Sequence, residues 1–294
     1  MVTDRKIIAS NGNTSVELTA APYTVQETKG FDGLEIQNVT SQGYDQDGAV
    51  LVNSYVLPRD NMEITGQVKA ETTYQMQHLR DKLFNVFIPK RDVTITHYYG
   101  GINRTITARV EKTPKFEFTD VSVVQNYSIC LKAVEPYWRD KLETLIPIAN
   151  VIGSFHFPLI IPKDKGVCFG IKNSSLIADV YNKSSIKVGM RIVFIANGAL
   201  SNPQLFDINT RKFLRLICDM EAGEMITVET GEENTVTRNK NGVTEDYIGH
   251  IDLAGGGDEF LELAPGDNLL RYGADEGEDM LEVQIYFYNK YPGV

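Results

Sequence analysis

The chain has 294 residues, of which 42% are hydrophobic and 23% charged, and its net charge is −10. A chain of this length usually divides into more than one core, so we expect two domains. No apolar run reaches the roughly 20 residues that span a bilayer, and the charged N-terminus is unlike a signal peptide, so membrane insertion is not expected.

The charge is uneven along the chain. Residues 1–138 carry 14 Lys and Arg against 16 Asp and Glu, whereas residues 139–294 carry 15 against 23. Binding of nucleic acid through its phosphates needs clustered Lys and Arg, so such binding is not expected. The three cysteines are far apart and the four histidines are isolated, which argues against disulfides and against a zinc site.

The first half of the chain alternates short strands with turns. Residues 61–68 are expected to pair with residues 50–57, and Gly100-Gly101 predicts a hairpin between the two strands that flank it. Residues 30–49 are rich in glycine and poor in apolar side chains, which predicts a long, turn-rich loop of functional importance. The strands predicted in this half are 5–10, 15–19, 23–27, 50–57, 61–68, 93–99 and 104–111.

One helix is predicted, over residues 71–88. Met76, Leu79 and Leu83, followed by Val86 or Phe87, recur at the spacing of a helix face. Pro89 ends the pattern, since proline cannot continue a helix. The first half is therefore predicted to be a strand-rich domain that carries one packed helix.

The stretch from residue 114 to residue 138 marks the predicted end of the first domain. After a bend at Pro114, apolar side chains fall mostly at every second position up to Leu131, as in a half-buried strand. Pro136 stops this strand, and two large rings, Tyr137 and Trp138, follow at once. We interpret Pro136, Tyr137 and Trp138 as a domain joint, with an ordinary core position for Trp138 as the alternative.

This interpretation divides the chain into a first domain at 1–138, a linker at 139–150 and a second domain at 151–294. The second domain has no helical period. Its short strands, separated by turn signals, predict a β-sandwich or jelly roll. The strands predicted there are 154–161, 175–181, 191–196, 204–209, 212–217, 225–229, 247–252, 260–263, 268–272 and 280–288.

Several acidic or glycine-rich stretches resemble chemical sites only in part. Residues 45–48 resemble the start of a calcium loop but lack its further ligands, and residues 273–279 are more simply a solvated turn. Asp258 and Glu259 are neighbours, which suits a glycosidase pair poorly. Gly255-Gly256-Gly257 lacks the Lys and Ser or Thr of a phosphate loop. We therefore predict no catalytic residue, no cofactor and no metal.

An ordered set of motifs resembles the siphophage distal tail protein family. Phe116 follows Pro114-Lys115, residues 133–138 end in Glu-Pro-Tyr-Trp, and residues 155–158 read Phe-His-Phe-Pro. Asn197-Gly198, Asn202-Pro203, residues 261–268 and a final strand closing in residues 288–294 continue the series. In the first half, Arg59 opens a strand that precedes the helix. The resemblance extends over nearly the whole chain.

The resemblance implies a mainly β protein of two domains. The first would be a tail-tube-like β-sandwich with one helix, and the second a galectin-like β-sandwich. Such proteins form a hexameric ring in the virion at the distal end of the tail, after assembly in the host bacterial cytoplasm. The ring joins the tail tube to tail-associated tip, receptor-binding or baseplate proteins, and DNA passes through it without specific binding.

Candidate ring contacts come from the loop at 30–49 and from the hairpin at 98–104. They are Gly33, Asn38, Gly43, Tyr44, Tyr98 and Tyr99. The alternative function is a carbohydrate-binding adhesion module that recognises host surface glycans, for which Tyr286 and Tyr288 on one side of a strand are candidates. A glycan-cleaving enzyme is the third hypothesis, but no carboxylate pair is nominated for it.

Overall fold

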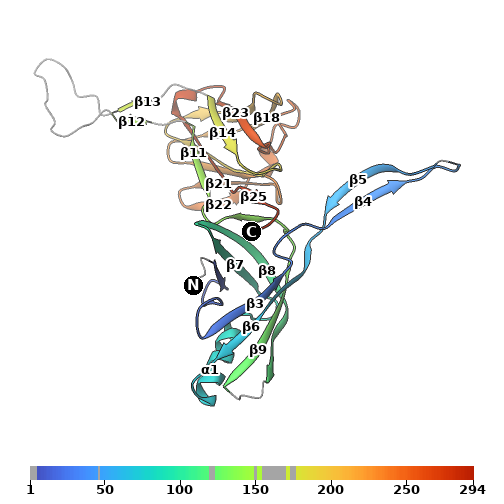
Figure 1. Cartoon of the computed structure of the whole chain (residues 1–294). Helices are drawn as coiled ribbons and strands as arrows, with labels where there is room; N and C mark the ends of the chain where they lie inside the picture. Colours follow the sequence, from blue (N-terminus) through green and yellow to red (C-terminus); the bar gives the residue numbers. More distant parts are fainter. Residues whose placement is uncertain (1–4, 46, 119–122, 149–150, 154–169, 173–176) are drawn as a thin grey trace, which may run out of the picture. The chain divides into compact units, whose positions relative to one another are not determined.

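The computed structural model describes residues 5–45, 47–118, 123–148, 151–153, 170–172 and 177–294. The chain forms two compact units, one of Met1–Lys141 with Lys290–Val294 and one of Leu142–Asn289. Both are built mainly of strands (Figure 1). Within the described ranges, no helix combines the length and the apolar character needed to cross a membrane.

Antiparallel strands of the first unit form a nine-stranded sheet. Its main path runs β2-β1-β7-β8-β9-β6-β3, and β10 pairs with both β8 and β25. The strands are β1 (Arg5–Ser10), β2 (Ser15–Glu17), β3 (Tyr23–Lys29), β6 (Arg59–Lys69), β7 (Asp92–Tyr99), β8 (Ile102–Phe118), β9 (Val124–Ala133), β10 (Trp138–Asp140) and β25 (Lys290–Tyr291).

The predicted helix is present as α1 (Thr73–Val86). The hydroxyl of Thr72 accepts a hydrogen bond of 3.1 Å from the backbone N–H of Gln75, which caps the helix at its start. Its apolar face, formed by Met76, Leu83 and Val86, is buried in the core of the first unit. The spacing in the sequence therefore located both the helix and its buried side.

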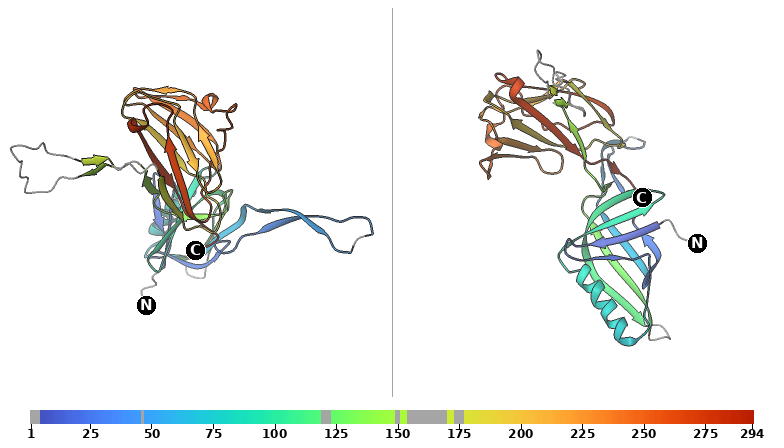
Figure 2. Two further views of the ribbon diagram at one scale, coloured as in Figure 1. Left: turned by 90° about the horizontal axis from the view of Figure 1, so that it is seen from above. Right: turned by 90° about the vertical axis from the view of Figure 1, so that its left-hand side faces the viewer.

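A long hairpin leaves the first unit and forms a separate two-stranded sheet. It consists of β4 (Ile36–Ser41) and β5 (Val50–Val56), and it projects as an extended ribbon (Figure 2). This differs from two predictions. Residues 36–41 of the expected loop form a strand, and β5 pairs with β4, whereas β6 pairs with β3 and β9. The following sections call residues 36–56 the arm.

The second unit is a β-sandwich, as predicted. Its larger sheet runs β11-β24-β15-β20-β21-β22 and its smaller sheet β14-β23-β17-β18. The larger sheet contains β11 (Thr144–Pro147), β15 (Arg191–Ala196), β20 (Met225–Glu229), β21 (Thr235–Lys240), β22 (Val243–Asp246) and β24 (Leu281–Phe287). The smaller sheet contains β14 (Ile177–Asn182), β17 (Gln204–Asp207), β18 (Lys212–Arg215) and β23 (Gly266–Gly273).

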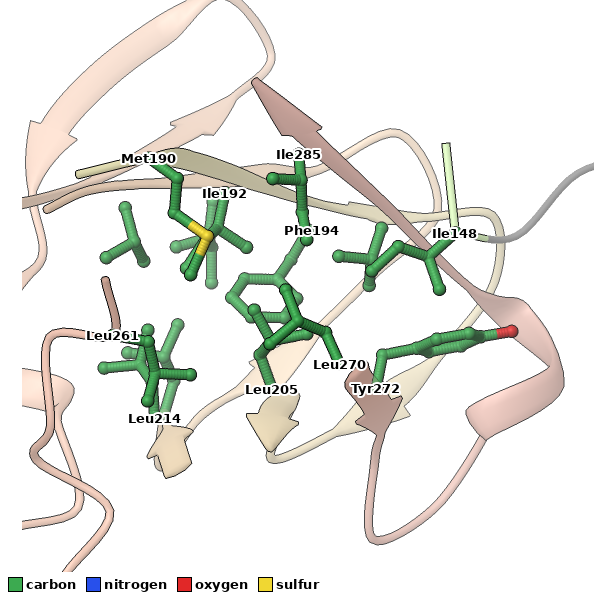
Figure 3. Close-up of a cluster of buried hydrophobic side chains, with 14 of the residues drawn as sticks. Ile148, Met190, Ile192, Phe194, Leu205, Leu214, Leu261, Leu270, Tyr272 and Ile285 are labelled. Atoms are coloured by element: carbon green, nitrogen blue, oxygen red, sulfur yellow. The ribbon is translucent and has the colours of Figure 1, made fainter. Parts of the chain in front are cut away.

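Side chains from both sheets meet in the core of the second unit (Figure 3). Ile192 and Phe194 of β15 lie in this core with Leu205 of β17 and with Leu270 and Tyr272 of β23. Short elements lie outside the two main sheets: β12 (Val151–Gly153), β13 (Gly170–Lys172), β16 (Leu200–Ser201), β19 (Asp219–Met220), η1 (Ile248–His250) and η2 (Glu278–Met280).

The boundaries of the units differ from those predicted. Residues 139–141 belong to the first unit rather than to a linker, and residues 144–147 form β11 of the second unit's larger sheet. Lys290–Val294 return to the first unit, because β25 pairs with β10. The chain therefore passes between the units twice.

The structure differs from two of the strands predicted in the second half. Residues 247–252 contain the 3₁₀ helix η1, at whose start the carboxylate of Asp246 accepts a hydrogen bond from the N–H of Ile248. Residues 260–263 form no strand, although Leu263 makes an isolated bridge with Val188. The predicted strand at 154–161 lies outside the described residues.

Candidate functional site

The arm is exposed to solvent along nearly its whole length. Between residues 35 and 55 every described residue except Val39 is exposed. The side chain of Tyr44 at its tip is fully exposed, and Leu51 and Val52 remain 59% and 63% exposed. A two-stranded ribbon that buries so little apolar surface is marginally stable in water, so the arm is the leading candidate for a contact surface.

The backbone of the arm is also available for pairing. Among the described strands, β4 and β5 pair only with each other, so each has one outer edge without a neighbouring strand. A β-bulge lies between Val39 and Thr40, and the hydroxyl of Ser54 donates a 2.7 Å hydrogen bond to the side-chain oxygen of Asn38 across the ribbon. The predicted contact residue Asn38 is therefore part of the pairing within the arm.

The base of the arm is held by hydrogen bonding and burial, in contrast to its exposed strands. We call residues 30–35 and 57–58 the neck. The N–H of Leu57 donates a 2.8 Å hydrogen bond to the carbonyl of Glu35 and closes the ribbon. Gly30 and Gly33 have φ of +70° and +72°, a region that favours glycine. Phe31 is buried between them.

Trp138 is buried in the core of the first unit. Its ring lies 5.3 Å from that of Phe31 and 6.3 Å from that of His97, between ring centroids. The indole N–H donates a 2.9 Å hydrogen bond to the carbonyl of Phe31, so this ring holds the neck directly. The core alternative for Trp138 is thus found, and the role of Pro136, Tyr137 and Trp138 as a domain joint stays a prediction.

The pKa of His97 is lowered to about 4. Burial is the main cause, and the positive charges of Arg5 and Arg104 act in the same direction, while Asp32 opposes them. The Nε of Arg5 donates a 3.0 Å hydrogen bond to Nε2 of His97, which requires that nitrogen to be unprotonated. The imidazole is therefore neutral near pH 7.

The hairpin between β7 and β8 forms as predicted, with Tyr99 opposite Ile102. Tyr99 and Ile102 are 62% and 55% exposed, whereas Tyr98 is half-buried. The Nζ of Lys141 donates a 2.9 Å hydrogen bond to the hydroxyl of Tyr98. The hairpin offers a second exposed apolar surface on the first unit, smaller than the arm.

Residues in or near the stretches that resemble chemical sites make structural contacts. Glu259 pairs with Lys212 at 2.8 Å, and the carboxylate of Asp252 accepts a hydrogen bond from the N–H of Gly255. Tyr286, a candidate for sugar stacking, is half-buried and lies under the guanidinium of Arg191 at 4.2 Å. No group of three potential metal ligands occurs among the residues that the structure describes.

Comparisons with known proteins agree with this architecture. Residues 18–122, which include the arm and α1, match the model of the phage tail protein RIFT-related domain. A crystal structure of the Dit protein of phage SPP1, titled a paradigm of the hub adsorption apparatus in phages that infect Gram-positive bacteria, is similar with a TM-score of 0.68. It is 15% identical, and the match covers 98% of this chain and 99% of that one.

Two structures of the phage P2 baseplate in its activated conformation, with Ca and with Sr, each contain a similar chain. Their TM-scores are 0.57 and 0.55, the identity is 12% in both, and each match covers 99% of both chains. No curated protein sequence matches the chain. The predicted resemblance is confirmed at the level of fold, because residues 18–122 match the model of a phage tail domain and nearly the whole chain shares the fold of the SPP1 Dit protein.

Proposed function

We propose that the protein is a structural hub subunit of a phage tail tip, not an enzyme, and that its first unit assembles into a hexameric ring through the arm. The observation that carries this proposal is the arm itself. It is a long ribbon with exposed apolar side chains and two strand edges that pair with no other described strand. A surface of another chain that pairs with the arm would bury its apolar side chains and its strand edges.

The charge of the arm favours contact with a different surface of the next subunit. The arm and its neck carry Asp32, Glu35, Asp45 and Asp47 and no Lys or Arg before Arg59. Pairing of one arm with the arm of a second copy would bring like charges together. A contact between the arm and another surface avoids this repulsion, and head-to-tail contacts of that kind close into rings when the rotation permits.

In this proposal the ring lies in the virion at the distal end of the tail, after assembly in the cytoplasm of the host bacterium. The similarity to a hub protein and to baseplate chains supports attachment to the tail tube on one side and to tip, receptor-binding or baseplate proteins on the other. The net charge of −10 supports passage of DNA without specific binding.

Replacement of residues 38–54 by a short Gly- and Ser-rich turn tests the proposal. The nine-stranded sheet of the first unit contains none of these residues, so both units should keep their unfolding temperatures. Sedimentation velocity at increasing concentration should show a large assembly for the intact chain and a monomer for the variant. Equal assembly of the two proteins would contradict the proposed role of the arm.

A further inference from the structure

A single buried arginine connects three distant segments at the neck of the arm. The side chain of Arg59, which is 7% exposed, donates hydrogen bonds to three backbone carbonyls. Its Nη1 lies 2.7 Å from the oxygen of Gly30, its Nε 2.5 Å from that of Pro136, and its Nη2 2.5 Å from that of Pro292. The three carbonyls belong to the neck, to the loop before β10, and to the segment Lys290–Val294, which we call the tail.

The tail is fixed to the first unit by further contacts. Trp138 of β10 pairs with Tyr291, and the Nζ of Lys290 lies 3.0 Å from a carboxylate oxygen of Glu135. Arg104 donates a hydrogen bond to the carbonyl of Gly293, and its guanidinium lies 3.9 Å from the centre of the Tyr291 ring. These contacts order the tail over its whole length.

The tail also reaches the neck directly. The N–H of Val294 donates a 3.2 Å hydrogen bond to the carboxylate of Asp32. The carbonyl of Phe31 accepts a hydrogen bond from the indole N–H of Trp138, and the carbonyl of Gly30 accepts one from the guanidinium of Arg59. Three consecutive residues of the neck are thus each held by a different part of the first unit.

We propose that Arg59 and the tail form a clasp that fixes the neck and thereby sets the direction in which the arm leaves the first unit. The proposal rests on the arm being the assembly element. A ribbon that is free to swing loses conformational entropy when it binds, whereas an arm already held at its neck loses less. Arg59 is a positioning residue, since it contacts the neck and not the surface of the arm.

The planar guanidinium is essential to this geometry. Its donors point in fixed directions and reach three separate carbonyls, whereas a lysine presents one compact ammonium. Arg59→Lys keeps the charge but cannot make all three contacts. Deletion of residues 292–294 removes the carbonyl of Pro292 and the N–H of Val294 and leaves Arg59 in place. Arg109→Lys is the matched control, because Arg109 is exposed on β8 and pairs with Asp92.

Amide hydrogen exchange of the dilute protein, measured by mass spectrometry, tests the clasp without assembly. Arg59→Lys and the tail deletion should each accelerate exchange at least about tenfold in residues 30–35 and 57–58. Exchange in α1 should stay unchanged, as should exchange of every segment in the control. Unchanged exchange at the neck would overturn the proposal, and so would an equal acceleration throughout the first unit.

Sedimentation velocity of the intact chain, the two clasp variants and the control tests the clasp and the proposed assembly separately. If the intact chain and the control assemble and the two clasp variants require at least about tenfold higher concentration, the clasp supports assembly. If all four assemble equally while exchange at the neck rises, the role of the clasp in assembly is overturned. If the intact chain never assembles but exchange at the neck rises, the clasp remains and the ring proposal is contradicted.

Discussion

Trp138 contributes to the first unit through both its volume and its one polar atom. The ring is fully buried, and its N–H is paired with the carbonyl of Phe31. Truncation of a buried tryptophan costs about 3–5 kcal/mol, so Trp138→Ala should lower the free energy of unfolding of the first unit by this amount. Trp138→Phe should cost less, because it keeps most of the packing and loses the hydrogen bond.

Urea unfolding followed by circular dichroism checks this prediction. Tyr74→Ala is the control, because Tyr74 is 75% exposed and should change stability by no more than about 0.5 kcal/mol. A neutral Trp138→Ala variant would show that the ring does not support the core. In the native chain, Trp138 is the only tryptophan, so its fluorescence reports on the first unit alone.

His97 should make the first unit sensitive to mild acid. Its pKa is about 4 in the folded chain and near 6.5 when unfolded, so unfolding takes up a proton between these values. The stabilising contribution is complete above pH 6.5 and is lost as the pH falls towards 4, by up to roughly 3 kcal/mol. His97→Gln, which keeps an acceptor for Arg5, should remove this part of the pH dependence.

The quantity to measure is the difference in the free energy of unfolding between the native chain and the His97→Gln variant. This difference cancels the pH dependence that the two proteins share. Urea midpoints from pH 7.5 to pH 4, followed by Trp138 fluorescence, should converge or cross as the pH falls. Parallel curves over the whole range would contradict a neutral, buried His97.

At the scale of elements, Gly30 and Gly33 form a matched pair in the neck. Both have positive φ, but an added Cβ at Gly30 would lie 2.7 Å from the backbone oxygen of Asn61, whereas at Gly33 it would meet nothing within 4 Å. Gly33→Ala should therefore cost about 1 kcal/mol through backbone conformation alone, and Gly30→Ala should cost clearly more.

Thermal unfolding of the two variants compares these costs. Hydrogen exchange of residues 30–35 should rise for Gly30→Ala more than for Gly33→Ala, since only the first substitution pushes the neck away from β6. Equal stability of the two variants would mean that the backbone approach at Gly30 is not close in solution.

Strands with a buried face could be predicted from the sequence, whereas the arm could not. The alternation of side chains located β1, β15 and β20 at their observed bounds. Strand β4 was missed because no face of it is buried, so the apolar period that marks a strand is absent. The pairing of β5 was wrong for the same reason, since proximity in the chain was the only guide available.

The candidate contacts in the arm were found through glycine content and not through any strand signal. Gly33, Gly43 and Tyr44 do lie in exposed parts of the arm or its neck. Arg59 was noticed only as a family landmark, and its three carbonyl partners could not be foreseen, because residues 30, 136 and 292 are far apart in sequence. The tail was recognised only as the end of the family resemblance, since a strand of two residues has no period.

At the scale of the molecule, the return of the tail to the first unit predicts the outcome of limited proteolysis. The chain passes from the first unit to the second after Lys141, and Leu142 is 79% exposed. A single cut near this point should give two fragments on a denaturing gel that still elute together under native conditions, because β25 remains paired with β10. The same cut in a chain that lacks residues 290–294 should release them from each other.

Size-exclusion chromatography of the cut proteins distinguishes these outcomes. Separation of the fragments after one cut in the intact chain would show that the tail does not hold to the first unit. Such a result would also contradict the clasp, which depends on the same segment.

The central claim is that the arm of one subunit builds a ring with the next. Single-particle electron microscopy of the purified full-length chain at high concentration tests this claim most directly, with the arm-replaced variant beside it. The account predicts rings of six protomers, each of 32.9 kDa, with the arm of every subunit lying on its neighbour, and no rings for the variant. Monomers of the intact chain at every concentration, or rings in which the arms remain in solvent, would contradict it.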